Sequence, residues 1–234
     1  MTRKTLYKKW QKLSTYKIEK IMEYFTLDLP ASKTAEILGI ERKTINNWYN
    51  YFREAIYRFC KKEEKEVLKW KIEIDESYFW PTRVKWKRGR WAWNKIKVFG
   101  LLKRNWKVYT QIVPNCTAKE LLPIIRWKVN KDSIINSDWW KAYDWLVDLG
   151  YQKHYRVHHW NNEFARWEQH INWIESFWSF TKRRLTKFNW IKSDKFPLHL
   201  KECEFRFNAR LQNKNLYNEI KRVVKLYYKI TQNL

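Results

Sequence analysis

The stretch KIEIDESYF at residues 71–79 begins a series of short strand-like segments. In it Ile72 and Ile74 alternate with polar residues, a pattern that predicts a half-buried β-strand. We expect strands at 71–79, 97–103, 107–113, 133–138 and 155–159, and helices at 117–129, 140–150 and 171–188. Three strands, a helix, a strand, a helix, a strand and then helices is the order of a ribonuclease-H-like α/β fold. Such a fold has a mixed central sheet with flanking helices.

Residues 1–60 have a helical pattern instead. Apolar residues recur at i, i+3, i+4 and i+7 over 17–27, which predicts an amphipathic helix. A second helix over 31–40 would end near Gly39, and a third over 41–59 opens with polar and basic residues. A short helix, a glycine turn and a second helix are typical of a DNA-binding helix-turn-helix, and a three-helix bundle with a polar face is the alternative. The residues expected to reach DNA are Arg42, Lys43, Thr44, Asn46 and Asn47.

The remaining boundaries follow from changes in composition along the chain. The charge-rich stretch KKEEKEVLK at 61–69 is expected to be a linker, so that the α/β catalytic domain would occupy 70–212. Helical spacing recurs over 199–211 and 217–230. We therefore expect a C-terminal helix within residues 213–234, after the α/β domain.

The charge of the chain indicates its kind of partner. The 234 residues include 49 Lys and Arg against 24 Asp and Glu, a formal net charge of +25. Such an excess favours a polyanion, usually nucleic acid, and a merely soluble basic surface is the alternative. No apolar run is long enough to cross a membrane, and three scattered cysteines without a CxxC pair support neither a disulfide framework nor a zinc ribbon. We expect a cytoplasmic, nucleoid-associated protein that binds double-stranded DNA and no membrane.

Three acidic residues lie where a phosphoryl-transfer site would need them. Asp75 ends the polar-apolar alternation of the first expected strand, Asp138 ends the fourth, and Glu175 lies near the start of the helix over 171–188. Carboxylates from neighbouring strand ends and a flanking helix can hold two divalent ions for an in-line displacement at phosphorus. Oxygen ligands suit magnesium or manganese. Lys182 lies two helical turns after Glu175 and could hold a DNA phosphate.

Each of these residues also has a structural interpretation. An isolated Asp at a strand end is commonly a turn residue. Asn172 and Glu175 have the spacing of a capping box, and they share one helix stripe, so Asn172 is the alternative third metal ligand. A carboxylate binds a hard cation better than an amide does, which favours Glu175. The basic residues of this helix form either a solvated face or a track for DNA, and they are Lys182, Arg183, Arg184 and Lys187.

The motifs IDE (74–76), SDWWKAY (137–143) and HINWIESFWSFTKRRLTKFN (170–189) occur in this order. They resemble those of the DDE-type transposases of bacterial insertion sequences. More narrowly, the chain resembles the ISXO-two-like domain of insertion-sequence family fifteen-ninety-five, in its ten-sixteen-like branch, from about residue 70 to about residue 210.

The resemblance implies magnesium-dependent cleavage and strand transfer at the ends of a mobile element. It implies Asp75 and Asp138 as metal ligands and Lys182 as their basic partner, whereas relatives have Asn, His or Glu as the third ligand. It also implies a homo-oligomer that binds terminal repeats and target DNA in a synaptic complex. Some relatives carry an N-terminal zinc ribbon, and its absence here leaves recognition of the DNA ends to the helix-turn-helix. The alternatives are a non-catalytic DNA-binding protein derived from a transposase and a ribonuclease-H-like nuclease.

The numbers of tryptophan and glycine look exchanged. The chain has 17 Trp and 4 Gly, whereas glycine averages about 7% of residues. Asn-Gly and Asp-Gly are the expected turn dipeptides, because type I′ turns require a positive φ at both central residues. In the family that this chain resembles, many of the tryptophan positions carry glycine. Five tryptophans outside the helix expected over 41–59 directly follow Asn or Asp, and most of them lie at or near expected element ends, although Trp145 lies within the helix expected over 140–150. The five are Trp106, Trp139, Trp145, Trp173 and Trp190.

We therefore hypothesise that a gene in which UGA encodes glycine was read with UGA as tryptophan. Trp48, Trp140 and Trp178 fit helical or family-like aromatic positions and Trp10 is undecided, which leaves 13 suspect positions. The alternative is an aromatic platform on which single-stranded bases stack. Under the recoding hypothesis, the chain as written folds poorly and is inactive, and the glycine version works.

Overall fold

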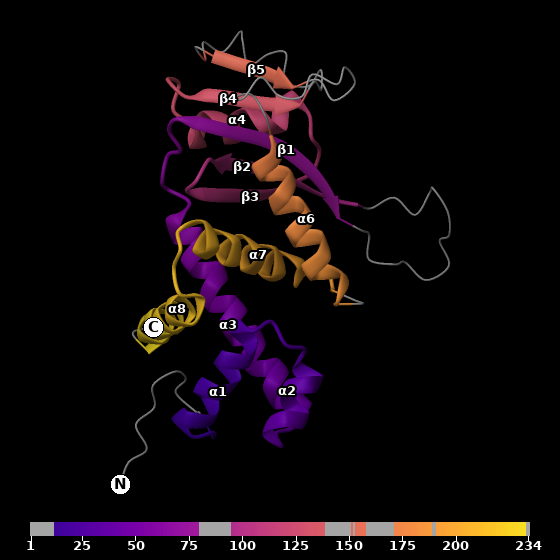
Figure 1. Ribbon diagram of the computed structural model, residues 1–234, viewed down its shortest axis with the longest axis vertical. Helices are drawn as coiled ribbons and strands as arrows, with labels where there is room; N and C mark the ends of the chain where they lie inside the picture. Colours follow the sequence, from indigo (N-terminus) through magenta and orange to yellow (C-terminus); the bar gives the residue numbers. More distant parts are fainter. Residues whose placement is uncertain are drawn as a thin grey trace, which may run out of the picture. The chain divides into compact units, whose positions relative to one another are not determined.

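The helical pattern before residue 64 and the strand pattern after it fall into different units of the structure, a computed structural model of the chain (Figure 1). The structure describes residues 12–79, 95–138, 151, 153–157, 171–188 and 191–232. One unit comprises residues 1–63 and 213–234, and the other comprises residues 64–212. The helix expected over 140–150 and residues 158 and 159 of the last expected strand lie outside the described residues.

The helical unit contains α1 (Thr15–Thr26), α2 (Ala31–Leu38), α3 (Arg42–Glu63) and α8 (Leu216–Gln232). The Ser14 side chain accepts a hydrogen bond from the Lys17 N–H and so caps the start of α1. Gly39 has a left-handed conformation with a φ of 61° and ends α2. α8 packs against α1 and α3, and the Tyr227 ring lies 5.2 Å from the Tyr51 ring. The C-terminal helix therefore completes the unit that the N-terminal helices begin.

α3 is longer than the helix expected over 41–59, because it continues to Glu63. Its last turn carries two lysines, and positive charge is favourable at a helix C-terminus. Leu68 is buried and forms a bridge with Val129 of the second unit. The stretch expected to be a linker, 61–69, is therefore helical at its start and anchored beside the sheet near its end.

The second unit is built on a five-stranded sheet in the order β3-β2-β1-β4-β5. β2 is antiparallel to both β1 and β3, and β4 is parallel to both β1 and β5. The expected mixed sheet is therefore confirmed. The strands are β1 (Lys71–Phe79), β2 (Ile96–Lys103), β3 (Lys107–Val113), β4 (Ile134–Asp138) and β5 (Lys153–Val157).

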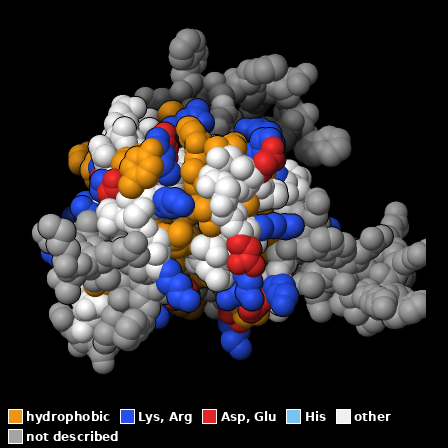
Figure 2. All heavy atoms as spheres, turned by 90° about the horizontal axis from the view of Figure 1, so that it is seen from below, with side chains coloured by type: hydrophobic (Ala, Val, Ile, Leu, Met, Phe, Trp, Pro, Cys, Tyr) orange, Lys and Arg blue, Asp and Glu red, His pale blue; other side chains and the backbone are white. Residues whose placement is uncertain are grey.

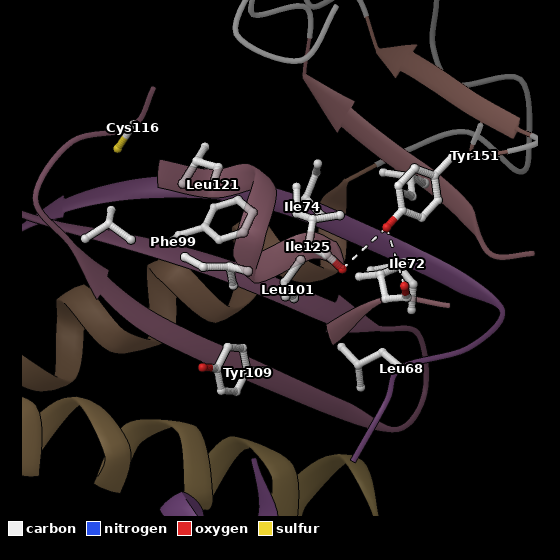
Figure 3. Close-up of a cluster of buried hydrophobic side chains, with 14 residues drawn as sticks. Leu68, Ile72, Ile74, Phe99, Leu101, Tyr109, Cys116, Leu121, Ile125 and Tyr151 are labelled. Atoms are coloured by element: carbon white, nitrogen blue, oxygen red, sulfur yellow. Dashed lines mark hydrogen bonds between the residues drawn. The ribbon is translucent and has the colours of Figure 1, made fainter. Parts of the chain in front are cut away.

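Helices cover both faces of this sheet, because alternate strand residues point to opposite faces and both sets are apolar over much of their length. On one face Ile72 belongs to a buried cluster with Leu121 of the covering helix (Figure 3). On the other face Leu102 belongs to a cluster with Phe177 and Leu200. The covering helices are α4 (Ala118–Lys128) on the first face and α6 (Asn172–Thr186) with α7 (Phe196–Leu211) on the second.

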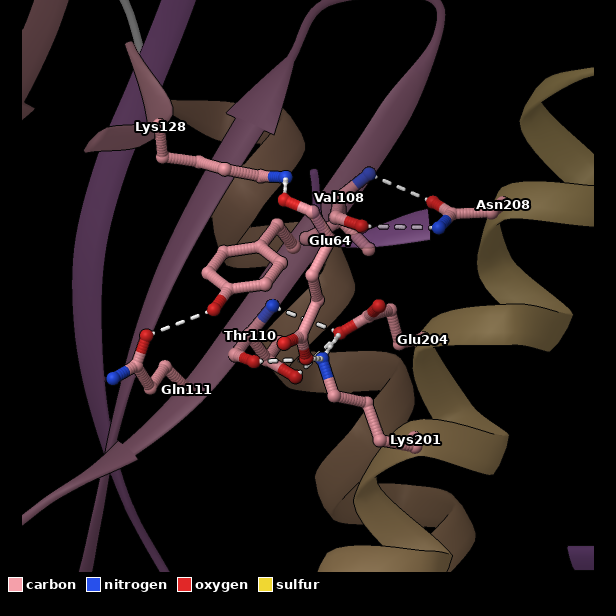
Figure 4. A network of polar contacts seen from close by, with 9 residues as sticks. Glu64, Val108, Thr110, Gln111, Lys128, Lys201, Glu204 and Asn208 are labelled. Carbon is pink, nitrogen blue, oxygen red and sulfur yellow. Dashed lines mark hydrogen bonds and ion pairs between the residues drawn. The ribbon is translucent and has the colours of Figure 1, made fainter. Parts of the chain in front are cut away.

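α7 also closes the outer edge of β3 with polar side chains (Figure 4). Asn208 accepts a hydrogen bond from the Val108 N–H at 2.7 Å and donates one to the Val108 carbonyl at 3.0 Å. Glu204 accepts from the Thr110 N–H at 2.8 Å, and Lys201 donates to the Thr110 carbonyl at 2.8 Å. These side chains satisfy backbone groups that a further strand would otherwise pair with, which protects the sheet from edge-to-edge association.

The described tryptophans fall into two groups by exposure. Trp48 and Trp178, which we expect to be genuine, are 7% and 4% exposed. The suspect residues Trp70, Trp106, Trp127 and Trp173 are 76%, 45%, 48% and 36% exposed. Backbone strain occurs at one of them, because Trp70 has a φ of +82°. At the Asn105-Trp106 turn Asn105 takes the positive φ instead, so the strain expected for Trp106 is absent there.

Candidate active site

Asp75 lies half-buried on β1, on the face of the sheet that α6 covers. Its Oδ1 accepts a hydrogen bond from the Glu76 N–H at 2.8 Å, and its Oδ2 accepts one from the Trp178 indole N–H at 3.1 Å. Its partner across the β1–β2 ladder is Gly100. A Cβ on Gly100 would lie 2.5 Å from Cζ2 of Trp178, so the indole reaches Asp75 across a position that only glycine leaves open.

The parallel pairing of β1 with β4 brings Asp138 to the level of Asp75. Glu73 of β1 lies opposite Asn136 of β4, and two residues further along each strand are Asp75 and Asp138. Neighbouring strands are about 4.8 Å apart, and residues in register point to the same face. The backbone therefore brings these two aspartates to adjacent positions on the α6 face. The Asp138 side chain is outside the described part of the structure.

α6 carries the other expected site residues along one stripe. Glu175, Trp178 and Lys182 are spaced at i, i+3 and i+7, and Asn172 precedes them by one turn. Trp178 is buried against the sheet, whereas Glu175, Lys182 and Asn172 are exposed. Because Trp178 contacts Asp75, this stripe of α6 runs beside the aspartate. The Glu175 carboxylate precedes the indole on the stripe, and the Lys182 ammonium group follows it.

The start of α6 is capped from β1 and not by its own side chains. The capping box expected over residues 172–175 is not formed. Instead Oε2 of Glu73 accepts hydrogen bonds from the Trp173 N–H at 3.1 Å and the Ile174 N–H at 3.0 Å. Oε1 of Glu73 accepts from Nε of Arg104 at 2.7 Å. A carboxylate suits the positive end of a helix dipole, so this contact fixes α6 to β1 two residues before Asp75.

The Glu73 carboxylate is fully buried between these groups. Burial raises its pKa above the usual range, and the bonds from the Ile174 N–H and from Arg104 oppose that shift. The contacts from Arg104 and the helix N-terminus favour the charged form. Glu73 is therefore a structural acid, and it has a different role from the half-exposed Asp75.

The donor chemistry fits a hard divalent cation, although the described side chains do not complete a site. Among them no group of three or more His, Cys, Asp or Glu side chains could hold a metal ion. The side chains of Asp75 and Glu175 are described and that of Asp138 is not. All three expected ligands supply carboxylate oxygens, which magnesium and manganese prefer.

Residues 67–208, more than half of the chain, match the family described as the ISXO2-like transposase domain. The chain belongs to the ISXO2-like transposase domain family. It is also similar to an uncharacterized transposase-like protein of Haemophilus influenzae, with 48% identity over 102 residues. That match covers 44% of this chain and 81% of the relative. The resemblance read from the motifs is thereby confirmed.

The solved structures to which this ISXO2-like chain is similar include two complexes of Mos1 transposase. The pre-cleavage Mos1 transpososome has 11% identity and a TM-score of 0.31, covering 86% of this chain and 80% of that one. The Mos1 strand transfer complex has 9% identity and a TM-score of 0.33, covering 97% and 79%. Scores this low carry no argument about the fold.

The basic residues that we expected to contact DNA do not all face solvent in the ISXO2-like chain. Lys182, Arg183 and Lys187 of α6 are exposed. Arg184 is buried and donates hydrogen bonds to Glu202 and to Cys203, so it is removed from the predicted DNA contacts. It lies on the buried stripe of α6, seven residues after Phe177. In the helical unit Arg42, Lys43, Asn46 and Asn47 are exposed and Thr44 is half-buried.

Basic side chains are not gathered into one patch on the face seen in Figure 2, where they occur at several separate places with acidic side chains among them. No helix in the described ranges is both long and apolar enough to cross a membrane. Sequence reasoning missed two residues beside the candidate site, Glu73 and Gly100. Glu73 could have been noticed because it lies in the IEIDE strand with Asp75, and Gly100 because it is one of only 4 glycines. Neither feature of the sequence predicts that both residues contact α6.

Proposed function

We propose that this chain binds the ends of its own mobile element and catalyses metal-dependent cleavage and strand transfer of double-stranded DNA. Its catalytic part would be a ribonuclease-H-like domain, which the strand order β3-β2-β1-β4-β5 with β2 antiparallel supports. The observation that carries the proposal is the adjacent position of Asp75 and Asp138 on parallel strands, beside the α6 stripe that holds Glu175.

In this proposal Asp75, Asp138 and Glu175 hold two magnesium or manganese ions, with Asn172 as the alternative third ligand. The ions would supply activation of water, and then of a 3′-hydroxyl, for attack on a phosphodiester. Lys182 binds a DNA phosphate from the exposed end of the same stripe. The Trp178 and Glu76 N–H groups hold the Asp75 carboxylate in one orientation. The exposed Arg183 and Lys187 extend the positive track along α6.

The helical unit would read the element ends as a helix-turn-helix. α2, the left-handed Gly39 and α3 have the order that this motif requires. The exposed residues at the start of α3 face solvent, as a recognition helix needs. They are Arg42, Lys43, Asn46 and Asn47, with Thr44 beside them. A homo-oligomer would bring two element ends and the target DNA together.

Cleavage and strand-transfer assays on labelled element ends test the proposal. We expect the chain with glycine at the suspect tryptophan positions to cut and join these ends with Mg²⁺, and Asp75→Asn in that chain to abolish both reactions while retaining binding to the ends. Asp132→Asn is the matched control, because Asp132 is an exposed aspartate of the same unit in the turn before β4. Cleavage by Asp75→Asn would overturn the site. Binding without cleavage by the chain that carries these glycines and an intact Asp75 would favour a non-catalytic DNA-binding protein, and hydrolysis without joining would favour a nuclease.

We also propose that the suspect tryptophans stand at glycine codons of the gene. The four that the structure describes are between 36% and 76% exposed, and Trp70 has a backbone conformation that favours glycine. The two described tryptophans that we expect to be genuine are buried. Sequencing the gene decides the matter, since UGA at the suspect positions with UGG at Trp48 and Trp178 is expected. UGG codons at the suspect positions would overturn the hypothesis.

A further inference from the structure

The Trp178 indole N–H donates a hydrogen bond to Oδ2 of Asp75 at 3.1 Å. The residue is 4% exposed and its ring packs near two other aromatic rings, with centroids 4.9 Å from Phe177 and 6.1 Å from Phe79. An indole has a single donor and no acceptor, and a buried one needs a partner. Its packing fixes the direction of the N–H, so the donor is aimed at Oδ2 of Asp75 before any ligand arrives.

Gly100 makes this approach possible. It lies opposite Asp75 on β2, and a Cβ there would meet Cζ2 of Trp178 at 2.5 Å, Cη2 at 2.9 Å and Cδ1 of Ile174 at 3.2 Å. Contacts below 3.0 Å require something to move. The indole is buried and packs near the Phe177 and Phe79 rings, so it would have to leave its position over Gly100. The glycine therefore sets how deeply α6 sits on β2.

We infer that Trp178 is a positioning residue for Asp75, and that Gly100 is required for it to act. The inference rests on the proposed function, in which Asp75 is a metal ligand. The indole N–H occupies Oδ2 and the Glu76 N–H occupies one side of Oδ1, so the carboxylate is held in one rotamer. Residues that orient a ligand in this way contribute about 10–100-fold to metal affinity.

Titration of the metal-free full-length chain with Mn²⁺, followed by electron paramagnetic resonance, measures this contribution without any turnover. Trp178→Phe keeps a packed ring and removes the donor, and we expect it to weaken Mn²⁺ binding about 10–100-fold. Trp173→Phe is the matched control, because Trp173 lies on the same helix with an exposed ring, and we expect no change. Gly100→Ala should weaken binding to a similar degree although it removes no donor.

The double variant Gly100→Ala/Trp178→Phe separates positioning from general damage. If both substitutions act through the same hydrogen bond, its affinity for Mn²⁺ equals that of Trp178→Phe alone, because the second change has nothing left to disrupt. Two losses that multiply would show independent effects and overturn the role of Gly100. A loss of thermal stability in Trp178→Phe with unchanged Mn²⁺ affinity would show a purely structural indole and overturn the inference.

Asp75→Asn distinguishes the failure of this inference from that of the proposed function. If the unaltered chain binds Mn²⁺ and Asp75→Asn binds it equally well, Asp75 is not a ligand and both ideas fail. If Asp75→Asn loses the ion and Trp178→Phe does not, the metal site stands and the positioning role is wrong. If Asp75→Asn and Trp178→Phe both lose affinity while Trp173→Phe does not, both ideas are supported.

Discussion

Replacing Trp70 with glycine is expected to stabilise the sheet unit. Trp70 directly precedes β1 and has a φ of +82°, a value that belongs to glycine in most turns. The backbone around it is held on both sides. The Leu68 N–H donates to the Lys128 carbonyl at 2.7 Å, and the Ile134 N–H donates to the Trp70 carbonyl at 2.9 Å. Trp70 therefore cannot change its φ without breaking the backbone hydrogen bonds that hold the start of β1.

The size of the gain follows from two opposing effects. A left-handed conformation lowers the free energy of unfolding by about 1–2 kcal/mol for a residue with a Cβ. Glycine itself lowers the free energy of unfolding by about 0.5–1 kcal/mol, because it loses more conformational freedom on folding. The indole is 76% exposed, so its removal sacrifices little buried area. The net gain in the free energy of unfolding is about 0.5–1 kcal/mol, and for a unit of this size that raises Tm by about 1–4 °C.

Urea unfolding of Trp70→Gly against the unaltered chain measures this gain, and Trp70→Ala is the control. Alanine also removes the exposed indole but keeps the Cβ, so we expect no gain from it. A stabilisation by alanine equal to that by glycine would refute the reasoning, because the gain would then come from removal of the ring. A loss of stability in Trp70→Gly would refute it as well.

Three further predictions concern buried charges of the sheet unit. Glu202→Ala leaves the buried Arg184 without its carboxylate and should cost about 3–5 kcal/mol in urea unfolding, whereas Glu219→Ala, which breaks an exposed ion pair, should cost less than 1 kcal/mol. Glu73→Ala removes the cap of α6 and should destabilise the unit more than Glu73→Gln, which retains an acceptor oxygen, and equal unfolding midpoints would contradict this role. Burial lowers the pKa of Lys128 from 10.5 to about 8. Between pH 8 and pH 10.5 the unfolded chain therefore binds more protons than the folded chain, and the free energy of unfolding should rise with pH. Lys128→Met, measured in parallel, should lack that part of the rise.

The sequence predicted the sheet well because its strands carry the alternation that a half-buried strand requires. The run over 71–79 forms β1 with the bounds expected, and the run over 107–113 forms β3. The sequence did not predict that side chains of α7 form hydrogen bonds with the backbone of the edge strand β3. Asn208 bonds to Val108 across 100 residues of sequence, and a contact of that range leaves no local pattern.

The arrangement of the candidate site residues could be predicted only in part, for a similar reason. Asp75 and Asp138 could be found because each lies in a short strand, and parallel neighbours bring such residues together. The cap of α6 was assigned to residues within the helix, since the spacing of Asn172 and Glu175 is a local signal, whereas the true acceptor is Glu73 of β1. Arg184 was misassigned from the run of basic residues alone. Its place on the buried stripe was visible in the helical spacing.

The contacts of α6 also show which tryptophans of this helix glycine can replace. Trp173 contributes its backbone N–H to Glu73, and its ring is 36% exposed, so glycine at 173 would keep the cap of the helix. Trp178 contributes its side chain, and glycine there would remove the donor to Asp75 and open the space over Gly100. Recoding at 173 is thus compatible with an intact site, whereas recoding at 178 is not. In the proposed site, the indole that orients Asp75 is therefore also the one that packs against the sheet.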